Sequence, residues 1–214
     1  MPDPGAGVTA LVLAAGRGSR YRAACAPDAQ PHKLLASLNC AEQSGPVLGR
    51  TLQALDGLVE RTLVLLREDD LALHQWAASW PETSGLQWYS LDSDGLGHSL
   101  AQGAAREQPQ RGYLVVLGDM PFVKRETFQR ILACIEPSRL VVPVFAERRG
   151  QPRGIGSAFR ASLLQCRGDR GAGHLFEPAE APIDELRVDD PGVLKDVDYP
   201  VDLSQAIPRP VHPS

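Results

Sequence analysis

The stretch Leu11-Val-Leu-Ala-Ala-Gly-Arg-Gly-Ser-Arg20 joins an apolar segment to a glycine-rich loop that carries two arginines. The apolar residues predict a buried β-strand that ends where the loop begins. The glycines, Gly16 and Gly18, allow the backbone to turn tightly and to bring its N–H groups close to an anion. The arginines, Arg17 and Arg20, add charge-assisted hydrogen bonds. The stretch therefore predicts a phosphate-binding loop, with a nucleotide as the expected ligand.

This loop matches neither of the two commonest phosphate motifs. Tyr21 stands where a dinucleotide fingerprint requires a third glycine, and no Gly-Lys-Ser/Thr follows Gly18 as a P-loop would require. A plain strand-to-helix turn that happens to contain glycine and arginine is the alternative for this segment taken alone. A second motif is needed to decide between them.

That second motif follows another apolar run, Tyr113–Leu117, and reads Gly118-Asp-Met-Pro121. A carboxylate at the carboxyl end of a buried strand lies on the edge of a parallel sheet where α/β proteins bind ligands. Asp119 is thus a candidate ligand for a divalent metal. Asp is also a common turn residue after a strand. The two motifs together favour the nucleotide site.

Strand-like and helix-like segments alternate along the chain, which predicts an α/β fold with a mostly parallel sheet flanked by helices. Apolar runs predict strands at Thr9–Leu13, Thr62–Leu66, Tyr113–Leu117 and Leu140–Val144. Three- and four-residue apolar spacing predicts helices at Pro46–Leu58, Asp70–Ser79, His98–Glu107 and Lys124–Ile135. After Pro143 the pattern predicts a small β insert, with Val144–Glu147, a turn near Arg149–Gly150, and Gly154–Phe159.

Composition narrows the class of protein. A chain of 214 residues with 43% hydrophobic content is expected to form one domain. The net charge of −4 argues against nucleic-acid binding, which requires a basic face. Four cysteines without a Cys-x-x-Cys pair fit a reducing cytoplasm, and the run Val8–Ala15 is too short for a signal or a membrane span. We expect a cytoplasmic protein that binds neither nucleic acid nor membrane.

Six motifs in order resemble those of the MobA-like nucleotidyltransferases, and within them the MocA-like molybdenum cofactor cytidylyltransferases. They cover nearly the whole chain: Leu13–Arg20 with Lys33-Leu-Leu35, Gly95–Leu100, Gly118–Val123, Arg149-Gly-Gln-Pro152, Gly168–Ala172 and Asp196–Asp202. The resemblance implies a Rossmann-like nucleotidyltransferase fold over 1–214. It also implies a nucleotide-binding half at about 8–143, an acceptor-binding half at about 144–206, and a flexible tail at 207–214.

The resemblance further implies transfer of a nucleoside monophosphate, CMP by preference from CTP, to the terminal phosphate of molybdopterin, with release of pyrophosphate. A molybdoenzyme would be the client that receives the product. A GTP-using enzyme and one that acts on a sugar or alcohol phosphate are alternatives with the same fold. A non-catalytic protein that delivers the cofactor is an alternative of another class.

The implied site has four parts. Lys33, Arg20 and Asp119 are the expected catalytic residues, and Mg²⁺ is expected on Asp119 and Asp198, since Asp196 and Asp198 would share one face of a short strand. Arg149 and Gln151 are expected at the acceptor, although Gln151 stands where the family usually has histidine. The expected nucleotide-binding residues are Leu13, Ala14, Ala15, Gly16, Arg17, Gly18, Gly97, Ser99 and Gly118.

Two of these interpretations have structural alternatives. Lys33 follows a spacer longer than the family's, so we expect it on a mobile flap; an exposed lysine is the alternative. Ser99 is equally suited to donate a hydrogen bond to the nucleotide or to cap a helix. Asp202 is expected to cap the closing helix.

Overall fold

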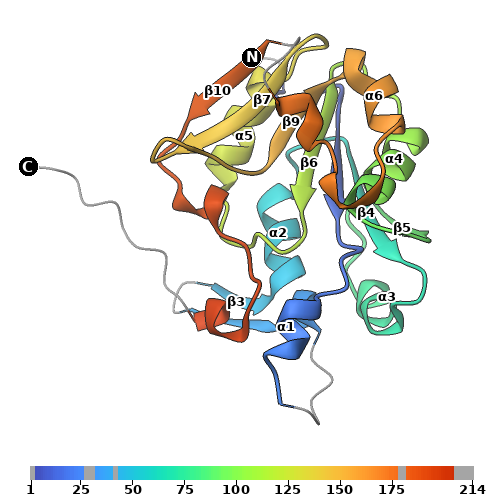
Figure 1. Ribbon diagram of the computed structural model, residues 1–214, viewed down its shortest axis with the longest axis vertical. Coiled ribbons are helices and arrows are strands. Elements are labelled where there is room, and N and C mark those ends of the chain that lie inside the picture. The colour runs from blue at the N-terminus through green and yellow to red at the C-terminus, as the bar shows by residue number, and fades with distance from the viewer. Residues whose placement is uncertain (1–2, 27–31, 41–42, 178–181, 205–214) are drawn as a thin grey trace, which may run out of the picture.

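A mixed eight-stranded sheet forms the centre of the protein in a computed structural model that describes residues 3–26, 32–40, 43–177 and 182–204 (Figure 1). The strand order is β10-β7-β9-β6-β1-β4-β5, and β8 pairs with β7. β9 runs antiparallel to both of its neighbours, whereas β6, β1, β4 and β5 are parallel. The strands are β1 (Val8–Leu13), β4 (Arg61–Arg67), β5 (Leu86–Leu91), β6 (Gly112–Leu117), β7 (Leu140–Phe145), β8 (Arg148–Arg149), β9 (Arg153–Gly156) and β10 (Ile183–Arg187).

Helices cover both faces of the sheet, and the side chains of β1 alternate between two cores. Ala10 and Val12 pack into one core with α2 (Val47–Leu55), α3 (Leu71–Ala78) and α5 (Arg125–Cys134). Leu11 and Leu13 pack into the other with α4 (Leu96–Arg106) and α6 (Arg160–Leu164). Figure 1 shows α4 and α6 side by side, away from α2 and α5. Burial on both faces explains why the strands are continuously apolar.

The α/β fold class and the mostly parallel sheet are confirmed. All four predicted strands and all four predicted helices are present, with ends that differ by at most three residues. The helix predicted from Asp70 begins one residue later, because Asp70 is its N-cap and its side chain accepts a hydrogen bond from the Leu73 N–H at 3.2 Å. Periodicity was sufficient for these elements because each buries one face or both.

The predicted turn near Arg149–Gly150 is wrong. The chain reverses at Ala146 and Glu147, whose φ angles are 48° and 61°, and Arg149 pairs with Val144 as part of β8. β9 then enters the main sheet between β6 and β7. The short strands of the C-terminal half are therefore part of the central sheet.

Several short elements had no clear signal in the sequence. β5 and β10 are edge strands with few buried side chains, so their residues lack an apolar run. The other helical elements span one or two turns, and they are α1 (Ser19–Ala23) and the 3₁₀ turns η1 (Lys33–Leu35), η2 (Ser157–Phe159), η3 (Gly168–Arg170), η4 (Gly173–Phe176), η5 (Pro191–Leu194) and η6 (Pro200–Ser204). A two-stranded hairpin consists of β2 (Ser37–Cys40) and β3 (Gln43–Pro46). The tail predicted at 207–214 lies outside the described residues.

The carboxyl ends of β1 and β6 meet at one edge of the sheet. The Gly118 N–H donates to the Leu13 carbonyl at 3.0 Å, so the two loops that follow these strands start side by side. The C-terminal segment returns to the same edge, where the Val197 N–H donates to the Asp119 carbonyl at 2.9 Å. Three parts of the chain that are distant in sequence therefore meet at this edge.

Among the described residues, no helix has the length and apolar character needed to cross a membrane.

Candidate functional site

A cavity of about 600 Å³ opens at this edge, between the glycine-rich loop, the start of α4 and the end of β6. Asp119 and the loop residues Gly16 and Gly18 line the same cavity, so the two sequence motifs face one space. Further lining residues are Leu13, Ala14, Ala15, Arg17, Ser19, Lys33, Leu34, Ser93, Asp94, Gly95, Leu96, Ser99, Leu117 and Asp169. The cavity has the size of a small-molecule site.

The backbone of the glycine-rich loop depends on Gly18. This residue has φ 59° and ψ 32°, a left-handed conformation, at the position just before α1. A Cβ at Gly18 would lie 3.4 Å from the Lys33 Cβ, an ordinary contact, so the left-handed backbone is what favours glycine here. A Cβ at Gly16 would have no neighbour within 4 Å, so the space around Gly16 stays open toward solvent and the cavity.

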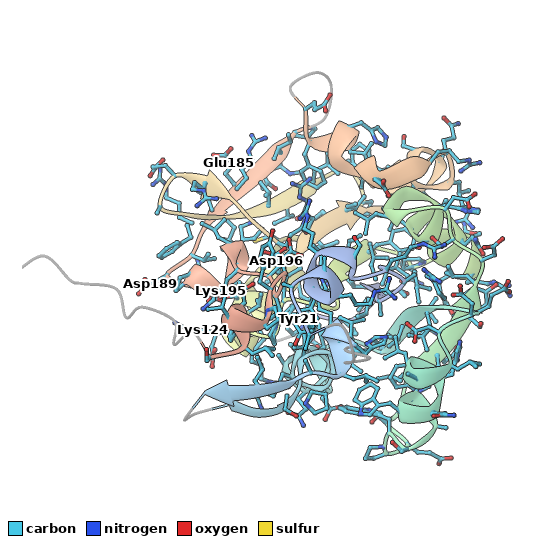
Figure 2. All side chains as sticks on the ribbon, turned by 60° about the horizontal axis from the view of Figure 1, so that its bottom comes forward. Tyr21, Lys124, Glu185, Asp189, Lys195 and Asp196 are labelled. Atoms are coloured by element: carbon cyan, nitrogen blue, oxygen red, sulfur yellow. The ribbon has the colours of Figure 1, made fainter. Side chains whose placement is uncertain are left out.

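Three carboxylates converge beside the loop. One oxygen each from Asp119, Asp196 and Asp198 lies within 4.8 Å of the others. The Oδ1 atom of Asp119 is buried and has no hydrogen-bond partner in the described part of the chain. The short strand expected at Asp196–Asp198 is wrong, because this segment is irregular. Although the segment is not a strand, the side chains of Asp196 and Asp198 both reach the cluster. Asp196, which Figure 2 labels with its chain neighbour Lys195, is exposed.

Two cations neutralise part of this negative charge. The Lys33 Nζ lies 2.6 Å from the Asp119 Oδ2 and 3.3 Å from the Asp198 Oδ1. The Arg20 Nη1 lies 2.6 Å from the Asp198 Oδ2. The Lys33 side chain is only 13% exposed, so the alternative of a solvent-exposed lysine is wrong. The flap expected before it falls partly on residues 27–31, which lie outside the described residues.

The charges of the cluster shift its pKa values in opposite directions. Burial lowers the pKa of Lys33, but the carboxylates of Asp119 and Asp198 outweigh it and raise this pKa above its ordinary value. Burial by itself would raise the pKa of Asp198. The hydrogen bond from Arg20 and the charge of Lys33 outweigh burial, so the pKa of Asp198 is lowered. For Asp196, burial and the negative charge of Asp119 both raise the pKa. Asp196 is thus the carboxylate whose charge the chain compensates least.

Asp202 orients the segment that carries Asp198. Its Oδ2 accepts hydrogen bonds from the Asp198 N–H at 3.0 Å and the Tyr199 N–H at 2.7 Å. The predicted capping role is confirmed for a 3₁₀ turn, because Asp202 lies in the first turn of η6 and its side chain reaches back to the N–H groups that precede this turn. Asp202 thus fixes the backbone at Asp198, while the Asp198 carboxylate itself contacts Arg20 and Lys33.

The start of α4 forms the opposite wall of the cavity. The buried Ser99 Oγ lies 2.6 Å from the Ser93 Oγ and 3.2 Å from the Gly95 carbonyl. Gly95 is the N-cap, so Ser99 is not. Gly97 faces away from the cavity, because a Cβ there would lie 2.6 Å from the Arg167 carbonyl. Gly118 likewise serves packing, since its Cβ would lie 3.1 Å from the Leu13 carbonyl.

Sequence reasoning missed three polar residues of this wall, namely Ser93, Asp94 and Asp169. The motif Gly168–Ala172 was a signal for Asp169, because it belongs to the family resemblance without an assigned role. Asp94 and Ser93 precede Gly95 in a loop whose sequence has no distinctive pattern. Their contribution depends on where α4 packs.

The two predicted acceptor residues lie farther along the sheet. The Arg149 Nη2 pairs with the Glu185 Oε1 at 2.7 Å, and its Nη1 donates to the Phe176 carbonyl at 3.0 Å. The Gln151 N–H donates to the Val193 carbonyl at 2.8 Å, which fixes the backbone next to the C-terminal segment. The Gln151 Oε1 is buried and has no partner in the described ranges. Neither residue lines the cavity that contains the glycine-rich loop.

Comparison with known proteins agrees with this arrangement. A family profile described as "MobA-like NTP transferase domain" matches residues 10–185, from the first strand to the last. The chain belongs to this family. The match includes the glycine-rich loop, Lys33 and Asp119, and it ends before Asp196 and Asp198.

Among curated proteins, the Bifunctional protein GlmU of Syntrophotalea carbinolica is 30% identical to this chain over 154 residues. That match covers 72% of this chain and 31% of GlmU, so the chain spans about a third of the length of this relative.

Solved structures resemble the whole chain. The crystal structure of Rv0371c from Mycobacterium tuberculosis H37Rv is 27% identical, with a TM-score of 0.71 over 91% of this chain and 95% of that one. The same protein in complex with manganese is 25% identical, with a TM-score of 0.65 over 92% and 93% of the two chains. The fold of this chain is thus common to both proteins.

Proposed function

We propose that this protein is a divalent-metal-dependent nucleotidyltransferase that transfers a nucleoside monophosphate, CMP by preference, from a nucleoside triphosphate to the terminal phosphate of molybdopterin. One observation carries the proposal: Lys33 and Asp119 line the same cavity as the glycine-rich loop, and Asp119 belongs to a cluster of three carboxylates. A phosphate-binding loop next to a carboxylate cluster is the arrangement that phosphoryl chemistry requires.

The residues of the cluster fit a divalent cation. Asp119 and Asp198 would hold it, with Asp196 as a third ligand, because the Asp119 Oδ1 has no partner among the described residues and the three carboxylates converge. Bound there, a cation would supply neutralisation of the triphosphate charge. Hard oxygen ligands suit Mg²⁺, our preferred metal, and Mn²⁺ also suits them. The manganese complex of the related Rv0371c supports this assignment.

The remaining residues bind and orient the substrates. The backbone N–H groups of residues 15–18 would hold the phosphates, since the Ala14 N–H already donates to the Leu65 carbonyl at 3.0 Å. Arg17, which lines the cavity, and Arg20, which pairs with Asp198, would hold the triphosphate tail. An oxygen of the acceptor's phosphate would attack the α-phosphorus in line, the bond to the β-phosphate would break, and pyrophosphate would leave. The ammonium of Lys33 would neutralise charge that develops on the α-phosphate. Positioning and charge neutralisation are all that the protein has to provide for this reaction.

The acceptor is the part of the proposal that depends on the family resemblance. Gln151, which stands where the family usually has histidine, favours a second candidate, a sugar or alcohol phosphate. GTP in place of CTP is the corresponding alternative for the donor. A protein that binds the cofactor and delivers it to a molybdoenzyme without chemistry would require neither Lys33 nor Asp119.

Pyrophosphate release from CTP and from GTP tests the proposal, with molybdopterin, a hexose 1-phosphate or no acceptor added. We expect release only with CTP, molybdopterin and Mg²⁺ or Mn²⁺ together, and none in EDTA. Pyrophosphate release with the hexose phosphate but not with molybdopterin would show that the acceptor is a sugar phosphate. The protein would still be a nucleotidyltransferase. Tight binding of CTP or molybdopterin in a thermal-shift assay without any release would instead identify a delivery protein.

A further inference from the structure

His32, the residue before Lys33, connects the turn that carries this lysine to helix α3. Its Nε2 atom lies 2.8 Å from the Asp70 Oδ2, and only 23% of the His32 side chain and 18% of the Asp70 side chain are exposed. His32, Lys33 and Asp70 line a second cavity of about 260 Å³, which Gly16 and Gly18 of the glycine-rich loop also line. Two segments 38 residues apart therefore meet beside the loop.

Each partner of this pair also fixes the first turn of a helical element. The His32 carbonyl accepts from the Leu35 N–H at 3.0 Å and from the Ala36 N–H at 2.9 Å, so η1 starts from His32. The Asp70 Oδ1 accepts from the Leu73 N–H at 3.2 Å at the start of α3. The Asp70 carboxylate thus caps α3 with one oxygen and holds the start of η1 with the other.

The hydrogen bond of the pair runs from the ring to the carboxylate. An ionised carboxylate only accepts hydrogen bonds, so the His32 Nε2 carries a proton and donates it to Asp70. The His32 Nδ1 is buried and has no partner in the described ranges, so Nε2 is the ring atom through which His32 acts. A hydrogen bond to a charged acceptor is stronger than one between neutral groups. The pair is therefore suited to hold two segments together.

Asp70 is fixed by the central sheet. β4 pairs with β1 and ends at Arg67, and the Asp70 N–H donates to the Arg67 carbonyl at 3.2 Å. Leu73, in the first turn of α3, has no exposed surface. The end of β4 and the capped start of α3 thus form one packed unit, to which His32 is attached.

The turn η1 is attached on both of its sides. On its C-terminal side, the Ala36 carbonyl accepts from the Val47 N–H at 3.0 Å, and Leu34 packs into the core. On its N-terminal side, the hydrogen bond from His32 to Asp70 connects the turn to α3. Loss of that hydrogen bond would free the side of the turn from which the lysine projects.

We propose that His32 is a positioning residue for Lys33. The inference rests on the proposed function, in which the Lys33 ammonium neutralises charge on the α-phosphate. Lys33 follows His32 directly, so a hydrogen bond that fixes His32 limits the movement of Lys33 relative to Asp119. A shift of about 1 Å in a reacting group can lower a rate by about a hundredfold. His32 itself need not touch the substrate to affect the reaction.

The variant His32→Ala tests this role. We expect kcat to fall about thirtyfold, with the KM for CTP within about twofold of the wild type, because the ammonium is retained but held less firmly. His32→Gln keeps a donor at the position of Nε2 and should recover most of kcat. The matched control is His74→Ala, which removes a partly buried histidine that bonds the Arg67 carbonyl at 2.9 Å, and it should keep the wild-type kcat.

Asp70→Ser separates positioning from the stability of α3. Serine is a good N-cap and can accept from the Leu73 N–H, but it is too short to reach His32. We expect the same loss of kcat as in His32→Ala, with a nearly unchanged melting temperature. The double variant should lose no more activity than either single variant, since both changes remove one hydrogen bond.

Hydrogen exchange reports the turn without any reaction. The Leu35 and Ala36 amides, which donate to the His32 carbonyl, should exchange at least about fivefold faster in His32→Ala and in Asp70→Ser than in the wild type and His74→Ala. Wild-type kcat in His32→Ala, or exchange that does not change in either variant, would overturn the inference. Absence of transfer by the wild type would end the proposed function, while the exchange rates would still decide whether His32 holds the turn.

Discussion

The two sides of the carboxylate cluster are built in different ways. On one side, Asp119 and the glycine-rich loop follow long buried strands, and adjacent β-strands of the central sheet bring them together. On the other side, a C-terminal arm, residues 189–204, carries Asp196 and Asp198 through 3₁₀ turns and irregular backbone. The strand side is positioned by the sheet, whereas the arm is positioned by Val193 and Val197, which pack into the core, and by polar contacts between distant segments.

Asp190 shows how such polar contacts add to this packing. It is 1% exposed, and its Oδ2 accepts from the Lys124 N–H at 2.9 Å and the Thr127 Oγ at 2.6 Å. Its Oδ1 accepts from the Gly192 N–H at 2.9 Å. One buried carboxylate thus joins the arm to the start of α5. Substitutions on the strand side should therefore remove chemistry alone, while those in the arm should also change stability or ligand placement.

The largest expected effect on the chemistry is that of Lys33→Ala. We expect kcat to fall by about a thousandfold, since a preorganised charge at the reacting phosphate is lost. Pyrophosphate release measures this, and circular dichroism should show an intact fold. Lys124→Ala, which removes an exposed lysine that donates to the Asp189 carbonyl, is the control. Wild-type turnover by Lys33→Ala would remove Lys33 from the mechanism.

Asp119→Asn should weaken metal binding by about a hundredfold, because a neutral amide replaces the charged carboxylate. Calorimetric titration with Mn²⁺ measures the affinity, and the activity should require correspondingly more metal. The unfolding midpoint should change little, since the strands that hold this position are buried independently. An unchanged dependence on metal would contradict the role of the cluster.

Asp190→Ala should weaken the attachment of the arm to α5. The change leaves two N–H groups and one hydroxyl without their acceptor in a buried place, and we expect a loss of about 3 kcal/mol in the free energy of unfolding. Urea denaturation measures the loss. Asp189→Ala, next to it, provides the comparison because Asp189 is exposed. Equal stabilities of the two variants would show that the arm is held by other contacts.

Asp202→Ala should have the smallest effect of the series. It removes the acceptor for the Asp198 and Tyr199 N–H groups, so Asp198 is held less firmly. We expect about a tenfold loss of Mn²⁺ affinity with a stability change of about 1 kcal/mol. Asp202→Asn keeps an acceptor oxygen and should recover part of the affinity. An affinity equal to that of the wild type in both variants would exclude an orienting role.

The sequence by itself determined the strand side of this site. Long apolar runs indicate buried strands, and both the glycine-rich loop and Asp119 follow such runs directly, so local pattern and sheet geometry predict that they share an edge. The family motifs extended this prediction to Lys33 and Asp198, whose side chains meet at 3.3 Å.

Only the tertiary structure decided the rest. Asp190, Ser93 and Asp94 had no signal in the sequence, because the role of each depends on partners that a single sequence does not reveal. Gly97 and Gly118 carry family motifs yet serve packing. The physical reason is the distance along the chain over which each signal acts. Periodicity is local and indicates which face of a helix or strand is buried, whereas a polar contact between distant segments depends on how the whole chain folds.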